Sequence, residues 1–278
     1  MVADIFLQDE ITFKADTHQY FNRQGVEYTS VSRLLDTIKV PFDRNGVSLN
    51  MARQVAESTG ISVGQAQREI LSEWDAKRDS SIDKGNFVHG GLEEYVLTGK
   101  VDPKLDIPIK YMQGVFKDYY RFYPEVMLYS HDYGVCGTTD LVLQRQKNKK
   151  PVMDFRDYKT NESKGIYFDS IKRKDGVKHY NRYYLPPFDH MEDCNYNQYA
   201  LQLSIYAFLA LSRLDIRVGN LGLIYFDNWL KPHYYPVPFM YHEAKWLCET
   251  NLVRKKLPEP VKEKPVVVFD PNNVEEDW

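Results

Sequence analysis

The sequence predicts an α/β protein in which helices come first, a mostly antiparallel sheet follows, and a further helix lies on that sheet. Three observations support this fold class. Residues 48–98 show helical periodicity, strand-like runs fill much of residues 125–160, and residues 196–213 again follow a helical pattern. A group of strands bounded by helices, without an internal repeat, is typical of one α/β domain.

The first expected elements are a hairpin and a short helix. Residues 11–28 alternate apolar and polar side chains and change direction near Asn22 and Gly25, which favours a β-hairpin. Ser30 follows directly and has a side chain suited to capping the helix VSRLLDTI. Pro41 lacks a backbone N–H, so we expect this helix to end before it.

Helices then give way to strands along the rest of the chain. Asp83 and Gly85 are expected to open the helix FVHGGLEEYVLTG and Gly99 to close it, and a second amphipathic helix covers residues 109–122. The next strands are EVMLYSHDYG, CGTTDLVLQR and PVMDFRDYKT, of which the last two are joined by a basic turn. After the helical pattern of residues 196–213 we expect strands LGLIYF and HYYPVPF and a final helix at residues 241–255.

Charged residues interrupt the strand PVMDFRDYKT near its end. Side chains two positions apart on a strand share a face, so Asp157 and Lys159 are neighbours. A hairpin that turns near residue 147 would also bring Asp140 beside Asp157. Two carboxylates suit Mg²⁺, which prefers oxygen ligands, and Lys159 would then orient or help to deprotonate an attacking water. For Asp157 and Lys159 alone, an ion pair at a strand end is the simpler explanation.

Two helical pairs add further polar side chains. His89 and Glu93 are four residues apart on the expected helix and so share a face. A histidine paired with a carboxylate can be a ligand for a second metal ion, whereas a lone helical histidine more often has a structural role. Gln202 and Tyr206 have the same spacing, and they either belong to the site or form the polar flank of an apolar helix.

Composition narrows the classes of protein. Apolar residues make up 43% and charged residues 27% of the chain, as in soluble globular proteins. No run of about 18 apolar residues is present, so no membrane span is expected, and the N-terminus does not resemble a secretory signal. The three cysteines are scattered, which argues against a disulfide framework, a zinc site or an iron–sulfur cluster. We therefore expect a cytoplasmic protein.

Basic residues are concentrated in two stretches although the net charge is −3. These are RQKNKK and the tyrosine-rich KRKDGVKHYNR, and solvated loops often have such compositions. Basic grooves with aromatic side chains also bind single-stranded nucleic acid, through phosphate neutralisation and base stacking. The candidate contacts to nucleic acid are Lys172, Arg173, Lys174, Tyr183 and Tyr184.

These motifs in their order resemble a known family. The set consists of His89, Gly137-x-x-Asp140, Asp157-Tyr-Lys159-Thr160 and Gln202-Leu-x-x-Tyr206. It resembles the RecB-like branch of the PD-(D/E)XK nuclease superfamily. The stretches HQYFNRQGVEYTSVSRLL and LPPFDHMEDCNYNQYALQLSIY are similar to versions carried by bacteriophages, and the similarity covers roughly residues 11–250. Each motif alone is weak, whereas the combination is specific.

The resemblance implies a restriction-endonuclease-like core, that is, a mixed central sheet flanked by helices, with a metal site. Asp140 and Asp157 would bind Mg²⁺ or Mn²⁺ with a contribution from the Tyr158 carbonyl. His89 would be the histidine of the upstream helix and a further metal ligand. Glu125 matches an acid often found before the core hairpin. The missing cysteines exclude the iron–sulfur subtype of this branch.

The remaining matches imply catalysis and binding. Lys159 would be the catalytic lysine, and Gln202 and Tyr206 would support the site and meet DNA. The implied activity is metal-dependent hydrolysis of phosphodiester bonds in DNA, most of all by an exonuclease of phage replication or recombination. A structure-specific or restriction-type endonuclease and a non-catalytic nucleic-acid-binding module remain alternatives.

The domain organisation follows from the same comparison. We expect one nuclease domain over residues 1–256, with residues 1–80 as its hairpin and helical part, residues 81–256 as its core, and an extended or disordered tail at residues 257–278. The segment between Lys159 and Gln202 is longer than a usual connection. It would form either a flap over the scissile strand or a surface insertion that covers a neighbouring helix.

The expected partner is DNA, as single strands or duplex ends, together with phage recombination or replication proteins and without a membrane. If a phage encodes the chain, the expected location is the host cytoplasm.

Overall fold

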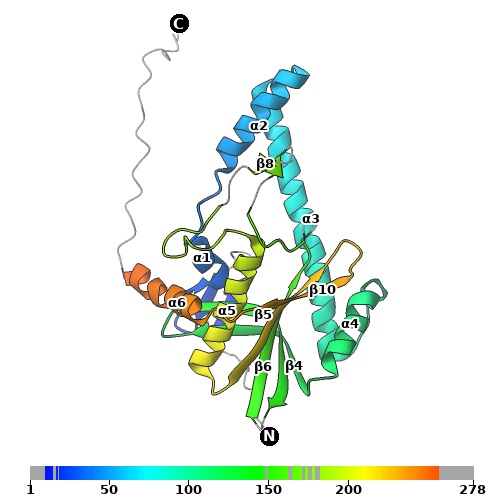
Figure 1. Cartoon of the computed structure of the whole chain (residues 1–278), viewed down its shortest axis with the longest axis vertical. Coiled ribbons are helices and arrows are strands. Elements are labelled where there is room, and N and C mark those ends of the chain that lie inside the picture. Colours follow the sequence, from blue (N-terminus) through cyan, green and yellow to red (C-terminus); the bar gives the residue numbers. More distant parts are fainter. Residues whose placement is uncertain are drawn as a thin grey trace.

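The computed structural model describes residues 10–14, 17, 19–147, 150–161, 165–170, 173–174, 177–178 and 182–256. Their main feature is a mixed sheet of eight strands with helices on both faces (Figure 1). The protein therefore has an α/β fold, and its sheet contains parallel as well as antiparallel pairs. Among the described residues, no helix is both long and apolar enough to cross a membrane.

Three short strands form the N-terminal arm of the sheet: β1 (Ile11–Lys14), β2 (Gln19–Asn22) and β3 (Glu27–Ser30). The predicted hairpin is confirmed between β2 and β3, where the Asn22 side chain accepts hydrogen bonds from the Gln24 and Val26 N–H groups. β3 then pairs in parallel with the start of β5 (Val135–Lys147). Local sequence patterns do not reveal a parallel pair between strands so far apart in the chain.

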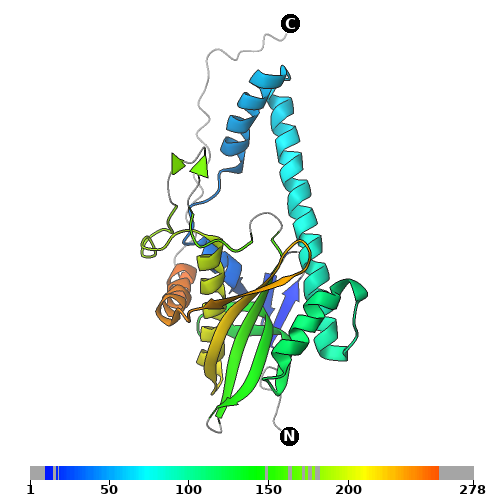
Figure 2. The same cartoon turned by 45° about the vertical axis from the view of Figure 1, so that its right-hand side comes forward.

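Three helices follow the N-terminal arm. Ser30 caps α1 (Val31–Asp36) as predicted and accepts a hydrogen bond from the Arg33 N–H at 3.2 Å. α2 (Arg44–Thr59) and α3 (Val63–Thr98) come next. α2 and the first half of α3 lie side by side and extend away from the sheet (Figure 1 and Figure 2).

α3 is one continuous helix of 36 residues, so the prediction that a helix opens at Asp83 and Gly85 is wrong. Both residues lie inside α3, whereas Gly99 closes the helix in a left-handed conformation, as predicted. Gly85 faces the end of strand β6 (Lys150–Lys159), and a Cβ added there would lie 3.5 Å from Thr160 Oγ1. That distance is an ordinary van der Waals contact, so Gly85 neither starts a helix nor is required by packing against the sheet.

The next elements are a 3₁₀ turn, η1 (Pro103–Leu105), helix α4 (Asp106–Phe116) and strand β4 (Arg121–Ser130). The predicted helix at residues 109–122 is therefore shifted toward the N-terminus. Its last predicted residue, Phe122, belongs to β4 and packs against Phe116 with ring centroids 4.2 Å apart.

The centre of the sheet consists of β4, β5 and β6, followed by β9 (Arg217–Phe226) and β10 (Pro232–Val237). β5 and β6 are antiparallel with Leu141 opposite Arg156, so residues 140 and 157 are also opposite each other, as predicted. β6 and β9 run parallel. The connection between β6 and β9 contains α5 (Asn195–Arg213), which is a crossover helix of the kind that parallel strands require.

Two apolar clusters fix the helices on the sheet. α1, α5 and α6 (Tyr241–Lys256) cover one face, where Val142 and Phe155 are buried. α3 and α4 cover the other face, where Leu141 and Tyr158 are buried. The two layers are seen on opposite sides of the sheet in Figure 2. Because both faces are covered, charged residues in these strands need partners within the protein.

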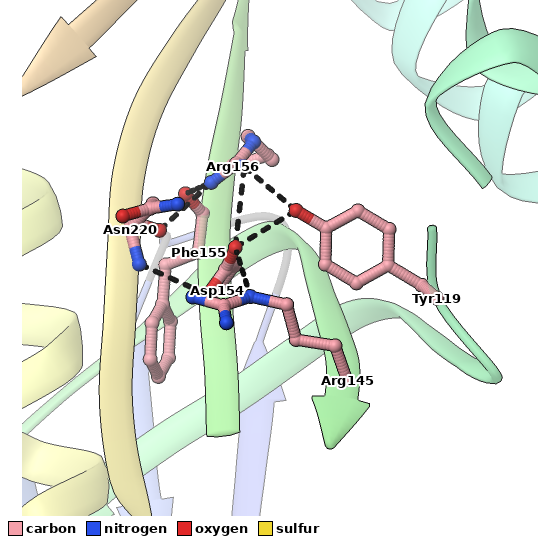
Figure 3. Close-up of polar contacts among 6 residues, drawn as sticks. All are labelled: Tyr119, Arg145, Asp154, Phe155, Arg156 and Asn220. Atoms are coloured by element: carbon pink, nitrogen blue, oxygen red, sulfur yellow. Dashed lines mark hydrogen bonds and ion pairs between the residues drawn. The ribbon is translucent and has the colours of Figure 1, made fainter. Parts of the chain in front are cut away.

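Figure 3 shows one group of buried charges on β6 that is fully partnered. Asp154 accepts hydrogen bonds from the Tyr119 hydroxyl at 2.8 Å, from Arg145 Nε at 3.1 Å and from the Asn220 N–H at 2.9 Å. Arg156 lies 3.6 Å from the same carboxylate. Since this carboxylate is completely paired, it links β5, β6 and β9 and is not a candidate reactive group.

Candidate active site

Three carboxylates form a row across three adjacent strands. Glu125 and Asp140 lie between the Pro124–Leu141 and Val126–Thr139 pairs of β4 and β5, and Asp140 and Asp157 come one residue beyond the Leu141–Arg156 pair of β5 and β6. β5 pairs with β3 up to Cys136 and with β6 only from Leu141 onward. Asp140 therefore lies between the part of β5 that pairs with β3 and the part that pairs with β6. Like charges on neighbouring strands destabilise a sheet unless a cation or a proton neutralises them.

His89 on α3 approaches this row from the side. Its Nδ1 atom lies 3.1 Å from Asp140 Oδ1, and its ring packs edge-on against Tyr158 at 5.6 Å. Burial alone would lower the pKa of His89, but the Asp140 carboxylate raises it to about 9. Burial alone would raise the pKa of Asp140. The neighbouring His89 outweighs burial, so the pKa of Asp140 is below its ordinary value. The other carboxylate oxygen of Asp140 accepts a hydrogen bond from the Tyr158 N–H.

Glu125 has an unusual backbone conformation for its residue type. Its φ angle is +47°, a left-handed value that non-glycine residues seldom adopt within a strand. Burial, reinforced by the nearby Asp140 carboxylate, raises the pKa of Glu125 to about 8. Possible ligand atoms of His89, Glu125 and Asp140 all lie within 4.8 Å of one another. A strained backbone at a cluster of perturbed groups is typical of a functional site.

Asp157 and Lys159 form the predicted ion pair at the end of β6. Burial raises the pKa of Asp157 to about 6 even though Lys159 opposes this change. The atom of Asp157 that contacts the Lys159 ammonium is Oδ2. Lys159 Nζ also lies 3.5 Å from Gln202 Oε1 and 4.4 Å from the centre of the Tyr199 ring. The pair is therefore buried and held from several sides, unlike an ion pair on the surface.

Gln202 and Tyr206 on α5 complete this group, as the sequence predicted. Gln202 Nε2 donates a hydrogen bond to the Tyr206 hydroxyl at 3.0 Å. Gly137 permits this arrangement, because a Cβ added there would lie 2.8 Å from Tyr206 Cε1 and 3.0 Å from Val31 Cγ2. Only glycine lets α5 and β5 approach each other this closely.

A cleft of about 540 Å³ is lined by His89, Glu125, Gln202 and Tyr206 of this group. β1, β2, the start of α1, α3, β4, β5 and α5 all contribute to its walls. Glu93, the weaker candidate on α3, lies in the wall but not in the three-residue ligand cluster. The residues lining this cleft, called here the main cleft, are Phe13, Tyr20, Ser30, Val31, Ser32, Asn86, His89, Gly90, Glu93, Glu125, Gly137, Thr138, Gln202 and Tyr206.

The donor set fits a hard divalent cation. Oxygen atoms predominate, as Mg²⁺ and Mn²⁺ prefer, and one imidazole nitrogen joins them. The residues that would hold the ion are His89, Glu125 and Asp140, and the expected ligation by Asp157, which is not part of this three-residue cluster, stays a prediction. The expected ligation through the Tyr158 carbonyl stays a prediction.

Tyr199 is one residue of this group that the motifs did not identify. It lies under the Lys159 ammonium, and its hydroxyl donates to Asn161 Oδ1 at 3.3 Å. The sequence contained a signal that could have identified Tyr199. Tyr199 and Gln202 are three residues apart and therefore share a face of α5.

The predicted nucleic-acid contacts are only partly described. Lys172 lies outside the described residues, and Arg173 and Lys174 form strand β7 (Arg173–Lys174), which pairs with β8 (Val177–Lys178). Tyr183 is 44% exposed and remains a candidate. Tyr184 is 3% exposed within the main core, so the prediction that it stacks on bases is wrong.

The burial of Tyr184 has a clear packing cause. The Leu185 N–H donates to the Ile38 carbonyl after α1 at 2.7 Å, and the Phe188 ring packs edge-on against Trp246 of α6. Residues 182–194 therefore cover neighbouring helices, as in the surface-insertion alternative.

Comparisons with known proteins add little to this geometry. No protein-family model and no curated protein matches the sequence. The crystal structure of SSO0001 is similar over 62% of this chain and 74% of its own, with 16% sequence identity and a TM-score of 0.24. A similarity at that TM-score carries no argument about fold or function.

Proposed function

We propose that the protein is a metal-dependent DNA nuclease of the RecB-like PD-(D/E)XK type, and most specifically an exonuclease of phage replication or recombination. The observation that carries this proposal is the position of the His89, Glu125 and Asp140 ligand cluster beside the buried Asp157 and Lys159 pair, with His89, Glu125 and Gln202 lining the main cleft. The mixed sheet flanked by helices is consistent with a restriction-endonuclease-like core.

Lys159 has a defined task in this proposal. Burial alone would lower its pKa, but the neighbouring Asp157 carboxylate raises it above the ordinary value, so the metal-free site holds an ammonium group. An ammonium donates hydrogen bonds and cannot accept a proton. Lys159 therefore orients a water or a phosphate oxygen and stabilises negative charge, while Gln202 and the Tyr199 ring fix its position.

The remaining side chains bind and orient. A divalent cation in this cluster would supply Lewis-acid stabilisation of the phosphate and a more acidic water. His89 holds Asp140 on one side while the Tyr158 N–H holds it on the other, which limits rotation of the carboxylate. Tyr206 fixes the amide of Gln202 beside Lys159. These contacts preorganise the ligands and the lysine before substrate binds.

Digestion of end-labelled DNA tests the proposal. Linear and circular substrates, single- and double-stranded, are incubated with Mg²⁺, Mn²⁺ or EDTA, and Asp157→Asn is the inactive control. An exonuclease releases label from linear DNA only and is inactive in EDTA. Cleavage of circles indicates the endonuclease alternative, and binding without cleavage indicates a non-catalytic module. Cleavage that persists in EDTA contradicts the metal mechanism.

The proposed setting follows from the proposed substrate. DNA, as single strands or duplex ends, is the partner, and phage recombination or replication proteins are candidate associates. A reducing cytoplasm, that of the host for a phage-encoded chain, suits three buried cysteines that form no disulfide.

A further inference from the structure

A second cleft lies next to the main cleft along α5. Its volume is about 490 Å³. Gln198 lines this second cleft and Gln202 lines the main cleft, and residues four apart share one face of a helix at a spacing of about 6 Å. The second cleft is lined by Asp36, Lys39, Val40, Pro41, Phe42, Tyr167, Arg182, Asp193, Cys194, Asn195 and Gln198.

The walls of the second cleft are anchored to the core. One wall is the connection from α1 to α2, and the other is formed by parts of the long segment before α5. Asn195 fixes this second wall, because its Oδ1 accepts from the Tyr167 N–H at 2.9 Å and its Nδ2 donates to the Gly165 carbonyl at 2.8 Å. The cleft is therefore built by hydrogen bonds at the start of α5.

The lining combines aromatic faces with balanced charge. Phe42 is 63% exposed and Tyr167 is 39% exposed. Each cation in the lining faces an acid of the same lining: Arg182 lies 3.4 Å from Asp193, and Lys39 lies 3.6 Å from Asp36. A phosphate would find no excess positive charge among these four side chains. A flat neutral group with hydrogen-bonding edges suits the lining better, because aromatic rings stack on it and the Gln198 amide can pair with its edge.

We propose that the second cleft binds an unpaired nucleobase of the strand whose phosphate occupies the main cleft. This inference rests on the proposed nuclease function and adds its substrate class, namely DNA that is single-stranded beside the scissile bond. A base in a duplex has both faces stacked and its pairing edge occupied, so it cannot enter such a cleft without flipping out. Tyr167 and Phe42 are then specificity-determining residues.

The test compares normal and abasic oligonucleotides in EDTA, where no cleavage occurs. Affinities of full-length protein are measured by fluorescence anisotropy for a single-stranded oligonucleotide, a sugar-phosphate strand of the same length without bases, and a blunt duplex. Tyr167→Ala and Phe42→Ala are compared with Phe168→Ala, a matched control whose ring packs against Tyr196 instead of lining the cleft. Thermal unfolding of every variant verifies the fold.

The expected result is specific to bases. Tyr167→Ala and Phe42→Ala weaken binding of the normal single strand by about 5- to 150-fold, the range found when stacking residues are replaced by alanine. The same variants bind the abasic strand like the wild type, and Phe168→Ala changes neither affinity. Equal losses on normal and abasic strands would mean that the cleft binds phosphate, and no loss at all would mean that it does not contact DNA. Either outcome overturns the inference.

Cleavage of the normal strand by the wild type in Mg²⁺ is measured separately. Base-specific binding without cleavage would contradict the nuclease proposal, whereas cleavage without the base-specific effect would contradict only the assignment of the second cleft.

Discussion

Replacing Glu125 by glutamine should make the metal-free protein more stable at high pH. The pKa of Glu125 rises from an ordinary 4.5 to about 8 because the carboxyl group is buried beside Asp140. Each pKa unit corresponds to about 1.4 kcal/mol, so ionising this group in the folded protein costs up to about 5 kcal/mol of folding free energy. Rotation of the side chain toward water reduces that figure, and we expect about 1 to 4 kcal/mol.

The sign of the effect depends on pH. Below about pH 4.5 the group is protonated in both folded and unfolded protein, so wild type and Glu125→Gln should have equal stability. As the pH rises toward 8, the unfolded chain ionises first and the wild type loses stability, while the glutamine variant does not. Glutamine has nearly the same shape and backbone preferences, so the left-handed φ of this position affects both proteins equally.

Urea denaturation in EDTA at pH 5, 7 and 9 measures this difference, and Glu73→Gln on the exposed part of α3 is the control. With Mn²⁺ at pH 8 the stability advantage of the glutamine variant should shrink or disappear. A cation at one hundred times its dissociation constant stabilises the wild type by about 2.7 kcal/mol, whereas an amide lacks the charge that helps to hold it. Parallel pH profiles for wild type and Glu125→Gln would show that Glu125 is not part of the buried acidic row.

Three further changes test the other groups. Asp157→Asn should keep the fold, as judged by circular dichroism, and should abolish cleavage, because an amide coordinates a hard cation poorly. Residual cleavage by this variant would exclude Asp157 as a metal ligand. Lys159→Ala should lower turnover by ~10²–10⁴-fold and leave DNA affinity within a few fold, and normal turnover would return Lys159 to a purely structural ion pair. His89→Ala should lose most nuclease activity at low Mg²⁺ and recover part of it in Mn²⁺. An equal loss of activity at all metal concentrations, together with a lower unfolding temperature, would mean that His89 has a structural role.

Local patterns predicted the parts of the site that lie on one hairpin or one helix. The alternation of β5 and β6 about a short basic turn was sufficient to place Asp140 opposite Asp157. Helical spacing placed Gln202 and Tyr206 on one face of α5. Such contacts depend on neighbours in the chain, so residue type and spacing determine them.

Other features depend on contacts between distant segments, and the sequence did not reveal them. Tyr184 belongs to a basic, tyrosine-rich stretch, but it is buried because its segment packs on α1 and α6. Glu125 turns into the site through a left-handed φ that no residue preference favours. Gly85 resembles a helix start, although it lies inside the continuous helix α3.

The parallel pairing of β6 with β9 has a consequence for the order of synthesis. Lys159 lies opposite Tyr225, so the strand end that carries Asp157 and Lys159 gains its second neighbour only after residue 225 has been made. Pairing between distant strands is slow, because a long loop must close before the contacts form. A growing chain on the ribosome thus contains His89, Glu125 and Asp140 well before it can arrange them with a fixed lysine. Under the proposed function, a chain that ends before residue 225 should therefore not cleave DNA, although it contains all three residues of the ligand cluster.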